Sequence, residues 1–533
     1  MTAVAGAGRR PGLLHSAIVV GGLRGADFLL SFLVSVLLAN RFGASGQLDA
    51  FFMARRTTVG FADTIRKLVG QIVMPTVVAR IDRGEGMSVR GLPPRTFLFL
   101  GGLIMLTLAG MLFPAALIGL FAPGFAGVRR DLATTMMAIL MPLLPVAVIA
   151  SVLMAALQAN RHYLASESTT LLQRAILVLV LIVAIPPLGI VAAAWTMLAA
   201  GLIGLIALAA GAWPLVRQRR ATPPAPTAIP TPAMPEQGGG VAAAILLFAY
   251  MQATSLLDFA VASRLADGSV AALEYGARLV SLVPGLVTAT LSTILYPELV
   301  RAIRNSDPAV TSAALARFQR LGLFVQLPVS LGMILGADLM VRILFGHGAF
   351  GEQGIGMATA TTAGYAAAAI FLTPLNATTS AIYADPRAPC LRDIGVIAGG
   401  GLLFRVAVLL WAAPRFGVAG VAWGAAVSTL LALILAQIVA VRRFPLFDIG
   451  AQHHDFARIA LCGGAGAIAG AAILIWGPPA QGLIARLATL AATGLATLAG
   501  YAATAALLRL PELTTVRPMI AALVARRAGR RAR

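Results

Sequence analysis

Residues 418–441 read VAGVAWGAAVSTLLALILAQIVAV, a run of 24 residues without a charged side chain. About 20 helical residues cross a bilayer core of about 30 Å, so this run is long enough to span a membrane. Such runs recur and are continuous rather than alternating, which favours helices over a β-barrel. We therefore expect an all-α polytopic membrane protein with about fourteen transmembrane helices. The predicted spans lie near 16–40, 49–79, 96–121, 133–159, 164–186, 188–216, 241–263, 271–300, 318–345, 353–383, 392–413, 418–441, 457–477 and 483–508.

The composition agrees with this fold class. Of the 533 residues, 59% are hydrophobic and only 11% are charged, whereas about a quarter of an average soluble domain is charged. So little charge argues against a large soluble enzyme. The net charge of +21 comes from arginines between apolar runs, so we expect no nucleic-acid partner. Cys390 and Cys462 are far apart and fit no metal or redox motif.

Basic residues are concentrated in alternate connections between the predicted spans. By the positive-inside rule these connections lie in the cytoplasm, and an even number of spans then places both termini there. The N-terminal run from Ile18 lacks a convincing cleavage site, so we interpret it as the first span and not as a signal peptide. The basic residues assigned to the cytoplasm include Arg9, Arg10, Arg161, Arg217, Arg219, Arg220, Arg442, Arg443, Arg526 and Arg527.

A proline-rich stretch divides the chain. It reads RQRRATPPAPTAIPTPAMPEQGGG and is typical of a semi-rigid linker. Six predicted spans precede it and eight follow it. We expect an N-lobe at 1–216, this cytoplasmic linker at 217–240, a C-lobe at 241–443, two further spans within 444–510 and a basic cytoplasmic tail at 511–533.

An internal repeat supports two six-helix lobes. The second span has FMAR at 52–55 and ends with IVMP at 72–75, while the eighth has YGAR at 275–278 and ends with ILYP at 294–297. The offset is 223 residues at the arginines and 222 at the prolines. Chance similarity between two hydrophobic helices is the alternative, but the matched arginines and prolines argue against it. Both spans run in one direction, so the repeat is a parallel pseudo-two-fold, a kind that places substrate sites near mid-membrane at its interface.

Charged residues inside the predicted spans are the main functional signal. Each costs about 2.5–3.5 kcal/mol on insertion scales, so such residues face a wet cavity or one another. In the second span they follow one face of a helix. Because guanidinium groups stay charged and donate two hydrogen bonds, they suit a diphosphate. We therefore predict a water-filled cationic cavity. Its predicted substrate-binding residues are Arg24, Arg55, Arg56, Arg66 and Arg278. The acidic residues predicted to pair there or to bind a cation are Asp27, Asp63, Asp258 and Glu274.

Several of these charges also have a structural interpretation. Glu274 with Arg278, and Asp338 with Arg342, lie four residues apart and can form ion pairs along a helix. We favour that interpretation for Asp338 and Arg342, and a functional one for Arg278, because its repeat mate lies on the charged face. The Arg66 side chain can instead extend to the cytoplasmic interface.

No catalytic pattern is present in the sequence. The five histidines are scattered, and no Walker phosphate loop occurs. We therefore expect no enzymatic activity, no metal site and no cofactor. Transport would use an ion gradient with an unidentified coupling ion, the membrane potential, or coupling to synthesis.

Several motifs resemble the MurJ/MviN family of lipid II flippases, within the superfamily of multidrug, oligosaccharidyl-lipid and polysaccharide exporters. The resemblance implies two six-helix lobes around a cationic cavity, two C-terminal helices that form a groove for a polyprenyl tail, and alternating access. Under it, Arg278 matches a cavity arginine of the eighth span and Asp258 an acidic position of the seventh. The motifs are RFGASGQLDAFFMARR at 41–56, QATSLLD at 252–258, YGARLVSLVPGLVTATLSTILYPELVR at 275–301, LFGHGAF at 344–350, IYAD at 382–385 and RFGVAGVAWGAAVST at 415–429.

The first span departs from the family pattern. Phe28 and Val34-Ser35 stand where the family carries cavity arginines, and Arg24 lies about one turn earlier as a candidate substitute. The resemblance implies a flippase of the bacterial inner membrane that moves a polyprenyl-diphosphate-linked saccharide, with lipid II as the leading substrate. An exopolysaccharide or O-antigen-type precursor, a cation-coupled multidrug exporter and a non-transporting scaffold are the alternatives. Expected partners are the bilayer and proteins of cell-envelope synthesis.

Overall fold

The computed structural model describes residues 13–82, 94–160, 162–183, 189–218, 238–282, 295–303, 307–385 and 390–514. These residues are helical apart from short connections and contain no β-strand, which confirms the all-α class. The chain divides into two compact units. The N-terminal unit is Met1–Leu38 with Gly46–Met234, and the C-terminal unit is Ala39–Ser45 with Pro235–Arg533.

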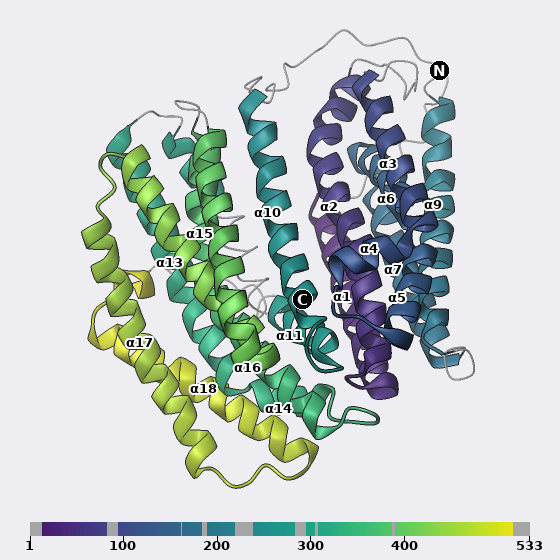
Figure 1. Cartoon of the computed structure of the whole chain (residues 1–533). Coiled ribbons are helices and arrows are strands. Elements are labelled where there is room, and N and C mark those ends of the chain that lie inside the picture. Colours follow the sequence, from purple (N-terminus) through teal and green to yellow (C-terminus); the bar gives the residue numbers. More distant parts are fainter. Residues whose placement is uncertain are drawn as a thin grey trace, which may run out of the picture. The chain divides into compact units, whose positions relative to one another are not determined.

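The N-terminal unit is a helical bundle organised around α2 (Gly46–Asp82). This helix packs against α5 (Gly127–Leu140) and α6 (Leu143–Ala159), while α7 (Tyr163–Val183) packs against α9 (Val191–Gln218) (Figure 1). Helix α9 also contacts α6, which joins the two sets. The first helix, α1 (Leu13–Phe42), has few close backbone contacts with other helices.

The predicted span 96–121 is not one straight helix. It forms α3 (Pro94–Leu112) and α4 (Pro114–Phe121), which meet at Phe113 with a bend of 93°. Pro114 occupies the first turn of α4, where a missing amide hydrogen is tolerated, but its ring and absent donor prevent α3 from continuing.

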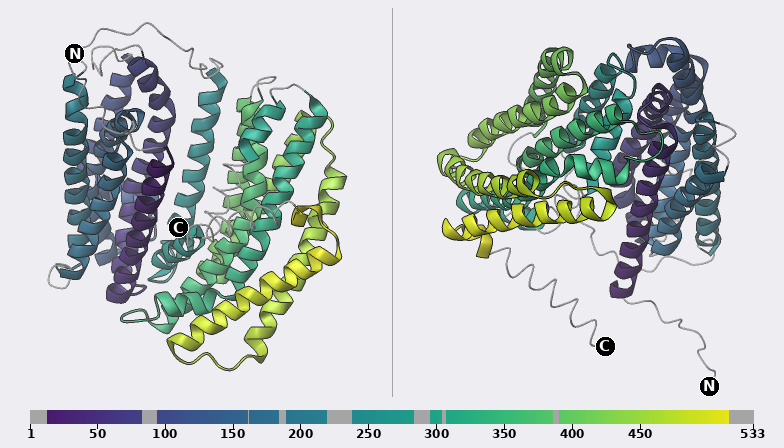
Figure 2. Two further views of the ribbon diagram at one scale, coloured as in Figure 1. Left: turned by 180° about the vertical axis from the view of Figure 1, so that it is seen from behind. Right: turned by 90° about the horizontal axis from the view of Figure 1, so that it is seen from below.

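The C-terminal unit contains the remaining helices. Helix α15 packs against α13 and α16, and α10 packs along α16, while α17 and α18 form a pair that contacts α13 (Figure 2). The bounds are α10 Gly238–Ala262, α11 Ser269–Leu282, α13 Pro308–Leu335, α14 Ala337–Leu344, α15 Glu352–Ala384, α16 Cys390–Arg443, α17 Ile449–Trp476 and α18 Gly482–Leu507.

Two predicted spans, 392–413 and 418–441, lie within the single 54-residue helix α16. The helix is interrupted at Gly417, whose φ of 59° lies in the left-handed region that glycine adopts without a steric penalty. Pro414, three residues earlier, further weakens the helical hydrogen bonding at this point.

The structure agrees with repeated membrane crossing. Among the described residues, ten helices are long and apolar enough to span a membrane, or eleven if α3 and α4 form one broken span. The protein is therefore a multi-pass membrane protein. Helix α2 is not among the ten and carries six charged residues between Asp49 and Lys67. The count of fourteen spans stays a prediction.

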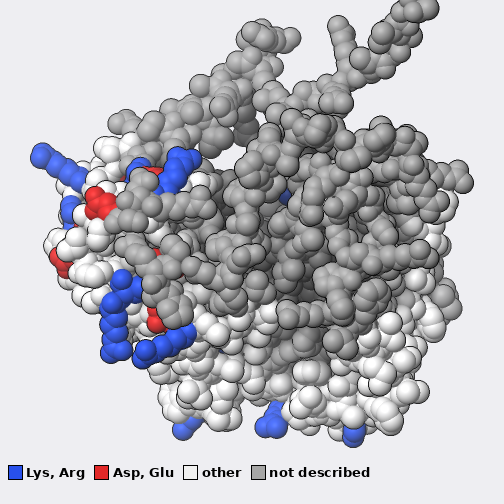
Figure 3. All heavy atoms as spheres, turned by 90° about the horizontal axis from the view of Figure 1, so that it is seen from above, with Lys and Arg blue, Asp and Glu red and all other residues white. Residues whose placement is uncertain are grey.

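Ion pairs link α13 to α17, and Arg443 of α16 to the end of α15 and to the first turn of α16 itself, in the C-terminal unit. Arg320 lies 2.5 Å from Asp455, and Arg443 lies 3.1 Å from Asp385 and 2.6 Å from Asp393. In Figure 3, acidic and basic side chains lie close together at the left of the face in view, and a few basic side chains stand at its lower edge, while the remaining described surface there is largely uncharged.

Candidate functional site

A cavity of about 120 Å³ lies inside the N-terminal unit. Side chains of α2, α6, α7 and α9 line it, and its charged side chains come from α2 and α7. The walls from α6 and α9 are apolar or small, with Leu143, Val146 and Met197 among them. The cavity therefore presents guanidinium groups against a mostly hydrocarbon background.

Helix α2 contributes the first charged wall. Its lining residues are Arg55, Val59, Ala62, Asp63 and Arg66, and steps of four, three, one and three residues keep them on one face of a helix. Arg66 Nη1 lies 3.5 Å from Asp63 Oδ1, whereas the Nε of Arg66 is buried without a hydrogen-bond partner. The structure thus brings together three of the residues predicted for the site.

Helix α7 contributes the second charged wall through Thr170, Gln173, Arg174 and Leu177. Arg174 is not among the residues predicted for the site from the sequence. The signal was present, since Arg174 is a charge within a predicted span and lies four residues after Thr170, on the same helical face. Arg174 Nε lies 3.5 Å from Oδ1 of Asp27, which comes from α1.

Arg24 does not line this cavity. Its guanidinium donates to both carboxylate oxygens of Glu167, at 2.7 Å to Oε1 and 3.2 Å to Oε2, and its side chain is 67% exposed. Arg56, one residue after Arg55, is half-buried and also lies outside the lining. A substrate contact for Arg24 and Arg56 stays a prediction.

The predicted residues of the eighth span lie in the C-terminal unit. Arg278 Nη2 lies 3.3 Å from Glu274 Oε1, one helical turn earlier on α11. Farther along the chain, Arg342 contacts Asp338 at 2.9 Å and Glu352 at 2.8 Å, so the predicted pairing of Asp338 with Arg342 is present. A substrate contact for Arg278 stays a prediction.

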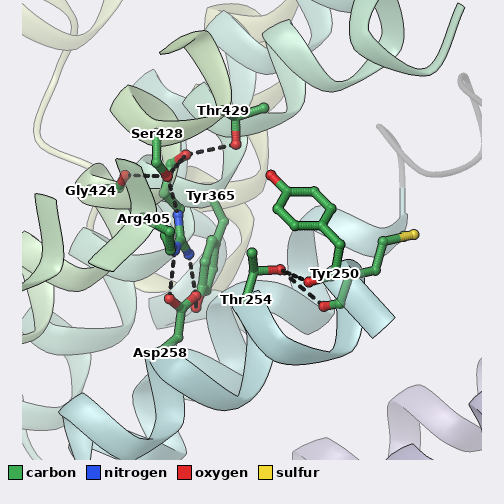
Figure 4. Close-up of polar contacts among 10 residues, drawn as sticks. Tyr250, Thr254, Asp258, Tyr365, Arg405, Gly424, Ser428 and Thr429 are labelled. Atoms are coloured by element: carbon green, nitrogen blue, oxygen red, sulfur yellow. Dashed lines mark hydrogen bonds and ion pairs between the residues drawn. The ribbon is translucent and has the colours of Figure 1, made fainter. Parts of the chain in front are cut away.

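Asp258 belongs to a buried polar network. In Figure 4 its carboxylate on α10 faces the guanidinium of Arg405 on α16, which donates from Nε at 2.8 Å and from Nη2 to the second oxygen. The Tyr365 hydroxyl donates to the same carboxylate at 3.1 Å, and Arg405 Nη1 donates to Ser428 at 2.8 Å. Of the two alternatives for Asp258, pairing with an arginine is present.

The two units therefore differ: the N-terminal unit has arginines on the wall of a cavity, whereas Arg405 in the C-terminal unit is buried in an ion pair with Asp258. Among the residues that the structure describes, the lining of the α2–α7 cavity has three arginines and one aspartate, with neutral hydrogen-bonding groups on Thr170 and Gln173. Such a surface favours an anion, because guanidinium forks bind phosphate oxygens through paired hydrogen bonds. Among the described residues, no group of three or more His, Cys, Asp or Glu side chains is arranged to hold a metal ion.

Comparison with known sequences places the chain near one family. A family profile described as lipid II flippase MurJ matches residues 38–478. A probable lipid II flippase MurJ from Rhizobium meliloti (strain 1021) is 26% identical over 364 residues, which cover 64% of this chain and 65% of the relative. The counterpart from Rhizobium tropici is 23% identical over 357 residues, which cover 63% and 64%. The aligned part thus spans just under two thirds of these relatives.

Comparison with solved structures shows a shared fold. A lipid II flippase MurJ in an inward closed conformation has a TM-score of 0.69 at 16% identity, covering 92% of this chain and 99% of that chain. An inward-facing multidrug resistance MATE family transporter of the MOP superfamily has a TM-score of 0.56 at 14% identity, covering 81% of this chain and 98% of that chain. At these identities the likeness concerns the fold alone.

Proposed function

Because the chain belongs to the MurJ family of lipid II flippases, we propose that it is a flippase for a polyprenyl-diphosphate-linked saccharide. The proposed substrate is the peptidoglycan precursor lipid II, and the proposed location is the bacterial inner membrane with both termini in the cytoplasm. The observation that carries this proposal is the cavity in the N-terminal unit, whose lining includes Arg55, Arg66 and Arg174 together with apolar side chains.

The side chains of the cavity suit the diphosphate, which is the part of such a substrate that is hardest to move through a membrane. A diphosphate loses its hydration when it leaves the aqueous phase, and an uncompensated charge in a low-dielectric environment is very costly. Guanidinium groups replace part of that hydration with charge-assisted hydrogen bonds. We therefore assign the diphosphate to Arg55 and Arg66, with the polyprenyl tail remaining in the bilayer.

Movement of the substrate would follow from differential binding. A ligand shifts a conformational equilibrium only when it binds one state more tightly than the other. Under alternating access, the headgroup would bind in one state and leave from the other. In this proposal a coupling cation does not bind at Asp258 in the described state, because Arg405 and Tyr365 already engage its carboxylate.

An exopolysaccharide or O-antigen-type precursor is the second candidate substrate. Phe28 and Val34-Ser35, where the family pattern carries arginines, favour it, because fewer arginines in the first helix imply a different headgroup. The diphosphate-binding chemistry is the same for both substrates, so the saccharide distinguishes them.

The test is genetic complementation. A bacterial host is depleted of its own lipid II flippase while this gene is supplied, and growth is measured together with the amount of the protein in the membrane. We expect growth to be rescued. Normal membrane insertion without rescue would reject lipid II as the substrate, and restored export in a strain lacking an exopolysaccharide flippase would then support the second candidate.

A further inference from the structure

We propose that Arg174 is a phosphate-binding residue of the α2–α7 cavity, and that Asp27 is its resident counter-ion, which the substrate phosphate replaces. This inference rests on the proposed function, because it assigns one more residue to the diphosphate of that substrate. In this inference, the carboxylate of Asp27 is exchanged for the phosphate when the substrate binds.

The contact between Arg174 and Asp27 is incomplete. Arg174 Nε lies 3.5 Å from Asp27 Oδ1, and this oxygen is buried without a hydrogen-bond partner. The side chains are 29% and 28% exposed, so the protein encloses this pair less completely than the pair of Asp258 with Arg405, whose side chains are 4% and 7% exposed. A charge contact without a hydrogen bond leaves the donors of the guanidinium fork available for a better acceptor.

The C-terminal unit shows what a completed pair of the same residue types looks like. Arg405 and Asp258 are separated by 147 residues, as are Arg174 and Asp27, and in both pairs the aspartate comes first. Asp258 accepts from two guanidinium nitrogens and from Tyr365, and its side chain is only 4% exposed. That pair is closed to a ligand, whereas Arg174 opens onto a cavity.

The surroundings of Arg174 favour a phosphate over the resident carboxylate. Arg55 and Arg66 line the same cavity and lie within electrostatic range of Arg174, with Asp63 as a carboxylate on that wall. A phosphate offers more acceptor oxygens than a carboxylate and so can engage several guanidinium groups at once. The volume of about 120 Å³ holds several water molecules, and therefore a phosphate group.

The exchange also links binding to the position of α1. In the described part of α1 and α7, two ion pairs join the helices: Arg24 with Glu167, and Asp27 with Arg174. Since α1 has few close backbone contacts with other helices, these ionic contacts matter to its placement. A phosphate on Arg174 removes one of the two, so a loaded cavity holds α1 less firmly than an empty one.

The experiment measures binding of farnesyl diphosphate, a short prenyl diphosphate, to the full chain in nanodiscs. The variant Arg174→Gln should weaken binding at least tenfold, because a charged donor fork is lost. The variant Asp27→Asn should strengthen binding about tenfold, because the competing charge is removed while the shape is kept. The result that supports the inference is weaker binding by Arg174→Gln together with stronger binding by Asp27→Asn. The control Arg317→Gln, at an exposed ion pair with Glu298 in the C-terminal unit, should bind as the wild type does.

The inference is overturned if both variants weaken binding, if either leaves it unchanged, or if the wild type does not bind this probe. Thermal unfolding in the same nanodiscs establishes that each variant is folded. Should Arg174→Gln fail to fold, Arg174→Lys keeps the charge without the fork and should bind more weakly than wild type. Growth rescue by the wild type with unaltered binding in both variants would reject this inference alone, whereas failure of the wild type in both assays would reject the proposed function.

Discussion

Asp258 and Arg405 meet as a buried ion pair across 147 residues of sequence, with both carboxylate oxygens accepting from the guanidinium. Asp27 and Arg174 repeat the order and the separation in the other unit, but at 3.5 Å and with side chains more than a quarter exposed. Asp258 lies near the C-terminal end of α10, whereas Asp27 lies in the middle of α1, so the two aspartates occupy different positions along their helices. The aspartate–arginine pair of the C-terminal unit is thus fully hydrogen-bonded, whereas that of the N-terminal unit is not, and its arginine lines a cavity.

Replacing Asp258 with asparagine should destabilise the protein strongly. Arg405 would remain buried without its counter-charge, and breaking such a pair costs about 3–5 kcal/mol of the free energy of unfolding. Thermal unfolding in detergent measures the loss. Adding Arg405→Met to Asp258→Asn should restore much of the stability, because both charges are then absent. A single variant as stable as the wild type would contradict the buried-pair description.

Replacing Arg55 and Arg66 together with alanine should abolish growth rescue. Each hydrogen bond to a charged group contributes about 1.5–3 kcal/mol, so loss of both arginines should reduce substrate affinity at least a hundredfold. The measurement is rescue at matched protein levels in the membrane. Arg317→Ala, which removes an exposed arginine of the C-terminal unit, is the matched control and should rescue fully. Full rescue by the double variant would refute the cavity assignment.

Reversing the charges of Arg24 and Glu167 should reveal how firmly α1 is attached. The single changes Arg24→Glu and Glu167→Arg each place like charges together and should lower stability slightly. The double reversal should recover the loss. Because Arg24 is largely exposed, the coupling between the two positions should be about 1 kcal/mol or less. A double-mutant cycle of unfolding temperatures measures it, and a coupling near zero would show that the pair does not hold α1.

Replacing Gln319 with leucine should loosen the attachment of α17. The Gln319 amide nitrogen donates to Thr378 at 2.6 Å and to Gln437 at 3.1 Å, and its amide oxygen accepts from Gln437 at 2.9 Å and Gln452 at 3.0 Å. All four residues are buried, so the change leaves unsatisfied polar groups at about 1–3 kcal/mol. Unfolding temperature and protease cleavage near residue 449 measure the effect. Replacing Leu461, which is 65% exposed, with alanine should have little effect.

Much of the fold could be predicted from local sequence patterns. Long apolar runs predicted helices because no other structure satisfies the backbone over such a length in lipid. The 3.6-residue period predicted that Arg55, Asp63 and Arg66 share one face, and the structure places all three on one cavity wall. The bend at Phe113 was not predicted, because a proline inside a long apolar run is also compatible with a single kinked helix.

By itself, the sequence determined the class of protein, the helices and the charged face of α2, since composition and periodicity depend only on neighbouring residues. Only the tertiary structure decided that Arg174 joins that face, that Arg24 is held by Glu167, and that Asp258 is held by Arg405. Those partners lie more than a hundred residues apart, and their meeting depends on which helix faces pack together. A charge pattern along one helix does not contain that information.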